Sequence, residues 1–185
     1  RIVQKDFFLN KEIFHSGYTK YQPVIDNEEY IRENDRIYQK ISEVSGMEYI
    51  IDSSKSPDRV ALLLKSQNIE PVVLHLVRDG RGVTWSFRKK YPTLFSAMRH
   101  WFNRNIKIGI VSRRAKKKYL FVSYEDFVRN SEKVLKGILN EFDLEFESQM
   151  LSFRGPDQHQ IAGNMMKFRQ SIEIREDQKW RANLP

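Results

Sequence analysis

An apolar run that stops abruptly at an arginine is the feature that most constrains the fold of this chain. The stretch 70–77, EPVVLHLV, is apolar at both alternating sets of positions apart from His75, and Arg78 follows it directly. A strand with two apolar faces is typical of a parallel sheet that helices cover on both sides. The run therefore predicts such a strand, with His75 as a core histidine whose hydrogen bonds are satisfied.

Two further strands are predicted, over 47–52 and 118–126, and helical patterns separate them. Glu28 and Glu29 favour the start of a helix that Gly46 ends, and Ser56 with Pro57 favours the start of another. The other predicted helices cover about 82–90, 95–116 and 131–142, and the core candidates of the longest are Met98, Trp101, Phe102 and Ile106. The alternation predicts an α/β fold, a mostly parallel central sheet flanked by helices, and the 185 residues suit a single domain, 1–185.

Composition limits the partners. The net charge of +8 fits an anionic partner, which could be nucleic acid, a membrane surface or a phosphorylated ligand. There is no cysteine, so disulfides and thiolate metal sites are excluded, and a reducing, cytoplasmic location is expected. No apolar run approaches the roughly 20 residues that span a bilayer, and no cluster of metal-ligand residues is visible in the sequence.

Polar residues follow all three predicted strands, in the segments DSSKSP (52–57), RDGRG (78–82) and SYED (123–126). In an open parallel sheet these carboxyl ends meet at the edge where ligands bind. Arg78 offers a planar fork of donors to a phosphate, and Ser86 lies near the start of the following helix, where anions are favoured. The segment predicts a phosphate clamp; the alternative is a surface turn with an incidental serine.

These segments resemble, in order, those of the sulfotransferases that use 3′-phosphoadenosine 5′-phosphosulfate (PAPS). LVRDGRGVTWS is similar to the family's 3′-phosphate-binding segment, which implies that Arg78 and Ser86 bind that phosphate. DSSKSP resembles the loop whose lysine, here Lys55, reaches the transferring sulfuryl group, and SYED resembles the strand end whose tyrosine, here Tyr124, contacts adenine. HQIAGNMMKFR (159–169) resembles a basic loop that closes over the 3′-phosphate, which would involve Gly163, Lys167 and Arg169.

The resemblance covers about 49–185 and implies a P-loop-NTPase-like sulfotransferase fold, with PAPS as donor and 3′-phosphoadenosine 5′-phosphate (PAP) as product. It implies an acceptor hydroxyl or amine on a carbohydrate or small molecule, and Glu12 or His15 as general base by position. Family members also carry a P-loop-like segment that cradles the 5′-phosphosulfate. The first 27 residues, with one glycine, contain no such segment, so we expect it upstream of Arg1.

Other interpretations stay open at the level of sequence. A P-loop kinase-like phosphotransferase shares the architecture and needs carboxylates for magnesium, for which Asp52 is a candidate. A basic nucleic-acid-binding protein is disfavoured, because the aromatic residues fall at predicted core positions and do not alternate with Arg and Lys on one face. Individually, Lys55 could be a solvated lysine, and Tyr124 could pack against the sheet.

Overall fold

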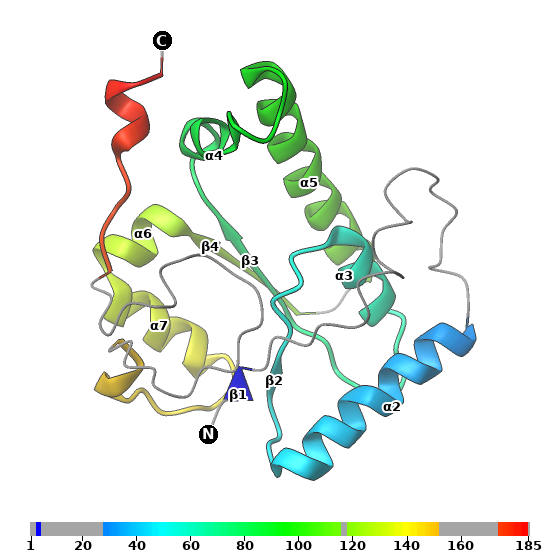
Figure 1. Ribbon diagram of the computed structural model, residues 1–185. Helices are drawn as coiled ribbons and strands as arrows, with labels where there is room; N and C mark the ends of the chain where they lie inside the picture. Colours follow the sequence, from blue (N-terminus) through cyan, green and yellow to red (C-terminus); the bar gives the residue numbers. More distant parts are fainter. Residues whose placement is uncertain (1–2, 5–27, 116–117, 152–173, 185) are drawn as a thin grey trace.

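The described strands form two parallel pairs. The computed structural model describes residues 3–4, 28–115, 118–151 and 174–184 (Figure 1). The paired strands are β1 (Val3–Gln4) with β2 (Ile50–Ile51), and β3 (Val73–Val77) with β4 (Tyr119–Ser123). Parallel pairing is confirmed, but in the described residues the pairs form two separate sheets, with no ladder between β2 and β3, and not the one central sheet that was predicted. The strand at the N-terminus was not predicted.

The first helices begin and end where local signals place them. They are α2 (Glu28–Ser45) and α3 (Pro57–Leu63). Gly46, with φ of +65°, adopts the left-handed conformation that ends α2, a conformation open to glycine at little steric cost. Ser56 caps α3, because its side chain accepts a hydrogen bond from the N–H of Arg59 at 3.5 Å. Caps of this kind are readable from sequence because they depend on neighbouring residues alone.

The remaining elements are α4 (Gly80–Phe87), α5 (Leu94–Ala115), α6 (Tyr124–Arg129), α7 (Ser131–Asn140) and the 3-10 turns η3 (Ser148–Leu151) and η5 (Lys179–Ala182). Two boundaries that matter for the site differ from the predictions. Helix α4 begins and ends earlier than the predicted 82–90, so Ser86 lies in its last turn and not near its start. Strand β4 ends at Ser123, and Tyr124 begins a helix. The cause is a side-chain cap, since the Ser123 hydroxyl accepts a hydrogen bond from the N–H of Asp126 at 3.2 Å. Among the described residues, no helix has the length and apolar character that crossing a membrane requires.

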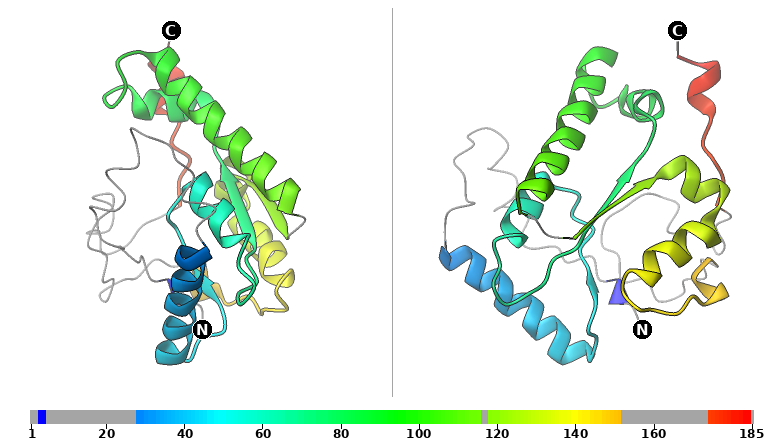
Figure 2. Two further views of the ribbon diagram at one scale, coloured as in Figure 1. Left: turned by 90° about the vertical axis from the view of Figure 1, so that its right-hand side faces the viewer. Right: turned by 180° about the vertical axis from the view of Figure 1, so that it is seen from behind.

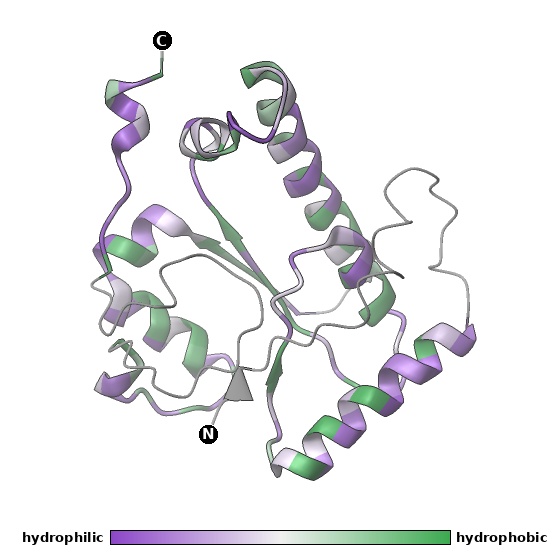
Figure 3. Ribbon diagram, in the orientation of Figure 1, coloured by the Kyte–Doolittle hydropathy of each residue, from purple (hydrophilic) through white to green (hydrophobic). Residues whose placement is uncertain are grey.

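Helix α5 packs against β3, α3 and α4, while α6 and α7 lie on the other side of the β3–β4 pair (Figures 1 and 2). His75 joins β3 to its neighbours: its Nδ1 lies 2.6 Å from the Tyr119 hydroxyl and its Nε2 lies 2.8 Å from Asn105 Oδ1. Both ring nitrogens therefore have partners, and the prediction of a satisfied core histidine is confirmed. Figure 3 shows the change from the hydrophobic β3 to the hydrophilic segment that leads into α4.

Two expectations about burial were wrong. Met98, Phe102 and Ile106, predicted as core, are 46%, 53% and 42% exposed. Trp101, the fourth predicted core residue, does pack against the chain at Gly80, and Ala97, four residues before it, is fully buried. The packed face of α5 therefore follows Ala97 and Trp101. On β3, Leu74 and Leu76 are also exposed, so the residues that the structure describes cover one face of this strand and leave the other open. Periodicity identifies an apolar face but does not say what covers it.

Candidate functional site

The ends of β3 and β4 meet, as predicted. In the parallel register Val77 lies opposite Ser123, so the next residues, Arg78 and Tyr124, are neighbours. The Arg78 guanidinium carbon lies 5.0 Å from the centre of the Tyr124 ring. A guanidinium at this distance from an aromatic face is held by cation–π attraction. The two strand ends thus present a cation and an aromatic ring side by side.

Arg78 extends along the start of α4. A Cβ atom placed on Gly82 would lie 3.0 Å from Arg78 Nε, so any side chain here would press on the guanidinium. Ser86 is exposed and lies four residues after Gly82, on the same face of α4 and one turn further along. The lack of a side chain at Gly82 therefore makes room for the Arg78 guanidinium.

Asp177, from the C-terminal segment, is the acidic partner of Arg78. Arg78 Nη2 donates to the Asp177 carbonyl oxygen at 2.9 Å and to its Oδ2 at 3.1 Å. Partial burial opposes ionisation of Asp177, but hydrogen bonds from the Lys179 N–H and from Arg78 outweigh it and lower the pKa of the carboxyl below 3.8. An anionic group therefore already sits on the guanidinium that was predicted to bind phosphate.

The C-terminal segment crosses α6 and reaches α4 (Figure 2). Arg129 of α6 donates to Glu176 at 3.3 Å, and the Tyr124 hydroxyl donates to the Arg175 carbonyl at 3.5 Å. Trp180 packs on α4, with Arg81 stacked 4.4 Å from its ring centre. Trp180 is thus a packing residue, and contacts on both sides of Asp177 hold this residue in place.

Lys55 lies on an exposed loop whose backbone is fixed. Its φ is +59°, in the left-handed region that residues other than glycine rarely adopt. The guanidinium of Arg104, on α5, donates a hydrogen bond to the Lys55 carbonyl. Gly80 packs against the ring of Trp101, one turn from Arg104 on the same helix. Helix α5 therefore anchors both the Lys55 loop and the turn after β3 (Figure 1).

Behind the Lys55 loop lies a cluster that we call the Arg59 cluster: Asn34, Tyr38, Asp52 and Arg59. Arg59 is 8% exposed and donates from Nε to Asp52 Oδ2 at 3.2 Å. Burial opposes ionisation of Asp52, yet hydrogen bonds from Tyr38, the Ser54 N–H and Arg59 lower its pKa below 3.8. Burial and the same carboxylate raise the pKa of Tyr38. Asp52, a candidate magnesium ligand in the kinase-like interpretation, is engaged by these groups instead.

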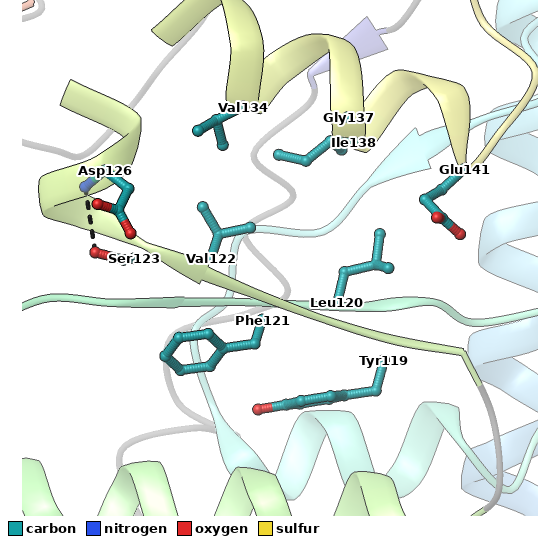
Figure 4. Close-up of a pocket in the computed structure, with 10 residues that line it drawn as sticks. All are labelled: Tyr119, Leu120, Phe121, Val122, Ser123, Asp126, Val134, Gly137, Ile138 and Glu141. Carbon is teal, nitrogen blue, oxygen red and sulfur yellow. Dashed lines mark hydrogen bonds between the residues drawn. The ribbon is translucent and has the colours of Figure 1, made fainter. Parts of the chain in front are cut away.

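A shallow pocket of about 350 Å³ lies between β4 and α7 (Figure 4). Its walls include Val122, Val134 and Ile138, and the carboxylates Asp126 and Glu141 lie at its ends. No Lys or Arg is among the described residues that line it. The pocket therefore lacks the cations that a phosphorylated nucleotide needs, in contrast to the ends of β3 and β4.

The side of the molecule that carries α4 and α5 is strongly basic. From Gly80 to Tyr124 the sequence contains no Asp or Glu. Just before this range, Asp79 caps α4 by accepting from the Arg81 N–H at 2.8 Å, and a hydrogen bond from the Arg81 side chain lowers the pKa of the Asp79 carboxyl. The charged side chains of this segment are therefore all basic, and one of them, Arg104, lies beside the Lys55 loop, where positive charge would attract an anion.

The structure places two predicted residues, Arg78 and Tyr124, side by side. Ser86 lies on the face of α4 along which Arg78 extends, and Lys55 lies on a separate loop that Arg104 of α5 contacts. Five residues lie outside the described ranges: Glu12, His15, Gly163, Lys167 and Arg169. Sequence reasoning missed Asp177, Arg104 and the Arg59 cluster. One signal existed: Arg59 lies three residues before the buried Leu62, and a charged residue on a buried helix face needs a partner.

No protein-family model matches the chain, and no curated protein matches its sequence. One solved structure is similar, a sulfotransferase domain from the curacin biosynthetic pathway, with a TM-score of 0.56 at 17% identity. The match covers 65% of this chain and 48% of that domain, so the chain spans about half the length of its structural neighbour. At this identity the likeness concerns the fold: the chain shares the mixed α/β fold of a sulfotransferase domain.

Proposed function

We propose that this protein is a PAPS-dependent sulfotransferase and that residues 1–185 belong to a single cytoplasmic sulfotransferase domain with a P-loop-like fold. The acceptor class is a hydroxyl or amine of a carbohydrate or small molecule. The observation that carries the proposal is the arrangement of Arg78. Arg78 directly follows β3, and its guanidinium faces the ring of Tyr124. The guanidinium also lies along the face of α4 that carries Gly82 and, one turn later, Ser86.

The residues fit a phosphorylated nucleotide. Arg78 and Ser86 would bind the 3′-phosphate, since a guanidinium fork and a serine hydroxyl can both donate hydrogen bonds to an oxyanion. Tyr124 would stack on or border the adenine. Gly163, Lys167 and Arg169 would close over the phosphate. Each of these roles follows from the family resemblance together with the position of the residue.

PAPS would supply an activated sulfuryl group, whose transfer demands in-line positioning and stabilisation of charge on the leaving oxygen. Lys55 would provide the cation for that oxygen, because it is exposed at the end of β2 on a loop with a fixed backbone. Glu12 or His15 would remove the acceptor proton. PAP would remain bound by Arg78 and Ser86 until it leaves.

The decisive experiment is calorimetric titration of the full-length protein with PAP and with adenosine 5′-phosphate, which lacks the 3′-phosphate. We expect PAP to bind far more tightly. Arg78→Ala should remove most of this preference and weaken PAP by roughly 10- to 100-fold, the worth of hydrogen bonds to a charged group. Arg88→Ala is the matched control, because Arg88 is exposed at the end of α4 and stacks on Trp85.

Each of three outcomes of this titration favours a different function. If the Arg88 variant retains the preference and the Arg78 variant loses it, a specific 3′-phosphate site is established. Equal binding of both nucleotides by a folded wild type would refute the proposal and favour the kinase-like phosphotransferase. Equal losses in both arginine variants, with tight binding of DNA instead, would favour a basic nucleic-acid-binding protein.

A further inference from the structure

The Arg59 cluster connects three separate elements. Asn34 and Tyr38 come from one face of α2, four residues apart, Asp52 follows β2, and Arg59 lies in the first turn of α3. The Tyr38 hydroxyl donates to Asp52 Oδ2 at 2.5 Å. The cluster is therefore a junction between α2 and both ends of the loop that carries Lys55.

Arg59 uses all three guanidinium nitrogens at this junction. Nε donates to Asp52 at 3.2 Å, Nη2 donates to the Tyr38 hydroxyl at 2.9 Å, and Nη1 donates to Asn34 Oδ1. A lysine ammonium could replace the charge but not this planar fork of donors. The geometry therefore requires an arginine and not merely a cation.

The cluster also fixes the backbone next to Lys55. Asp52 Oδ1 accepts a hydrogen bond from the N–H of Ser54 at 2.8 Å, immediately before Lys55. On the C-terminal side of this amide, Arg104 donates a hydrogen bond to the Lys55 carbonyl. A non-glycine residue keeps a left-handed φ only where its surroundings impose it, and these contacts supply that constraint.

We propose that Arg59 is a positioning residue for Lys55: through Asp52 and Ser54 it holds the backbone conformation from which the Lys55 amino group acts on the transferring sulfuryl group. This inference rests on the proposed function and adds a residue to it. Arg59 is buried and contacts the loop that carries Lys55, so its effect on catalysis passes through that loop.

The kinetic test compares Arg59→Lys with Arg36→Lys in the full-length protein, using PAPS and an accepted hydroxyl substrate. Arg36 is the matched control, because it is an exposed arginine of α2 that pairs with Glu33 at 2.6 Å. We expect Arg59→Lys to lower kcat by roughly 10- to 100-fold, as a displaced catalytic group does. The affinity for PAP should stay within about twofold, because Arg78 and Ser86 are carried by other elements.

A double-mutant cycle distinguishes a positioning effect on Lys55 from a general loss of structure. In a Lys55→Ala background, Arg59→Lys should cause no further loss of kcat, because the group that it positions is absent. Tyr38→Phe removes one hydroxyl and keeps the Arg59–Asp52 pair, so it carries the test if Arg59→Lys fails to fold. Hydrogen exchange at the Ser54 amide should accelerate in both variants, while the amides of α7 should not change.

The outcomes distinguish the two proposals. Two results would overturn the role of Arg59 alone, provided that the wild type transfers sulfuryl groups. One is an unchanged kcat in Arg59→Lys. The other is that the kcat losses of Lys55→Ala and Arg59→Lys multiply in the double variant. A folded wild type that neither binds PAP nor transfers sulfuryl overturns the proposed function and the role of Lys55 with it. Loss of kcat that disappears in the Lys55→Ala background supports both.

Discussion

Arg78 directly follows β3 and Arg59 lies in the helix that follows β2; both pair with an aspartate, yet their surroundings differ. Arg59 is 8% exposed, and its three nitrogens donate to three side chains that the fold itself supplies. Arg78 is 22% exposed, and its partner Asp177 is 45% exposed. Within the described residues, both hydrogen bonds of Arg78 leave from Nη2. The first arginine is committed to structure, whereas the second keeps donors for a ligand.

The largest expected difference between the two arginines is in their contribution to the free energy of unfolding. Arg59→Met should reduce the free energy of unfolding by about 3 kcal/mol, because it leaves the partly buried Asp52 carboxylate without its cation and removes the donors to Tyr38 and Asn34. Arg78→Met should cost less than about 1 kcal/mol, because water can solvate the exposed Asp177. Urea unfolding followed by circular dichroism measures both. Comparable losses in the two variants would remove the distinction and make Arg78 a structural residue too.

The two regions also differ in how far the sequence predicted them. The turn at Arg78 was predicted with its neighbour Tyr124, because both were placed at the carboxyl ends of predicted strands, and parallel strands bring these ends together. The Arg59 cluster was not predicted, because Arg59 and Asn34 are 25 residues apart and no local pattern links them. Local caps, such as Ser56 before α3, were predicted from adjacent residues alone.

The same reasoning explains the errors in the fold. Whether β2 and β3 belong to one sheet is decided by what lies between them, and an apolar strand pattern does not contain that information. The exposure of Phe102 likewise depends on which face of α5 packs against β3. The hydrogen bond between Asn105 and His75 of β3 shows that the packed face is the one that carries Asn105. The left-handed conformation of Lys55 was not predictable, because it is imposed by distant side chains and not by its own residue type.

A smaller difference should appear in the pH dependence of stability. The folded pKa of Asp52 lies below its ordinary value of 3.8, so its contribution is present above about pH 4 and is lost as the pH falls through the folded pKa. Asp52→Asn should therefore be less stable than wild type by about 2 kcal/mol at pH 7, and this difference in the free energy of unfolding should narrow below pH 4.

Asp177→Asn should differ less from wild type over the same pH range, because the Arg78–Asp177 pair is more exposed. Urea unfolding at a series of pH values checks both, and a gap for Asp52→Asn that stays constant down to pH 2 would contradict the assignment.

The smallest expected effect concerns the anion that Arg78 already holds. In Asp177→Asn the backbone carbonyl at this position still accepts from Arg78 Nη2, so the guanidinium should keep its orientation while one negative charge disappears. PAP should then bind roughly twofold to fivefold more tightly, in line with the worth of an exposed ion pair, and the gain should shrink as salt is added. Calorimetric titration compares it with Asp143→Asn, which removes the same charge after α7, where the left-handed φ of +54° suits asparagine. Weaker binding in Asp177→Asn alone would show that the carboxylate orients Arg78 for the phosphate, which would make Arg78 depend on a preorganising partner as closely as Lys55 depends on Arg59.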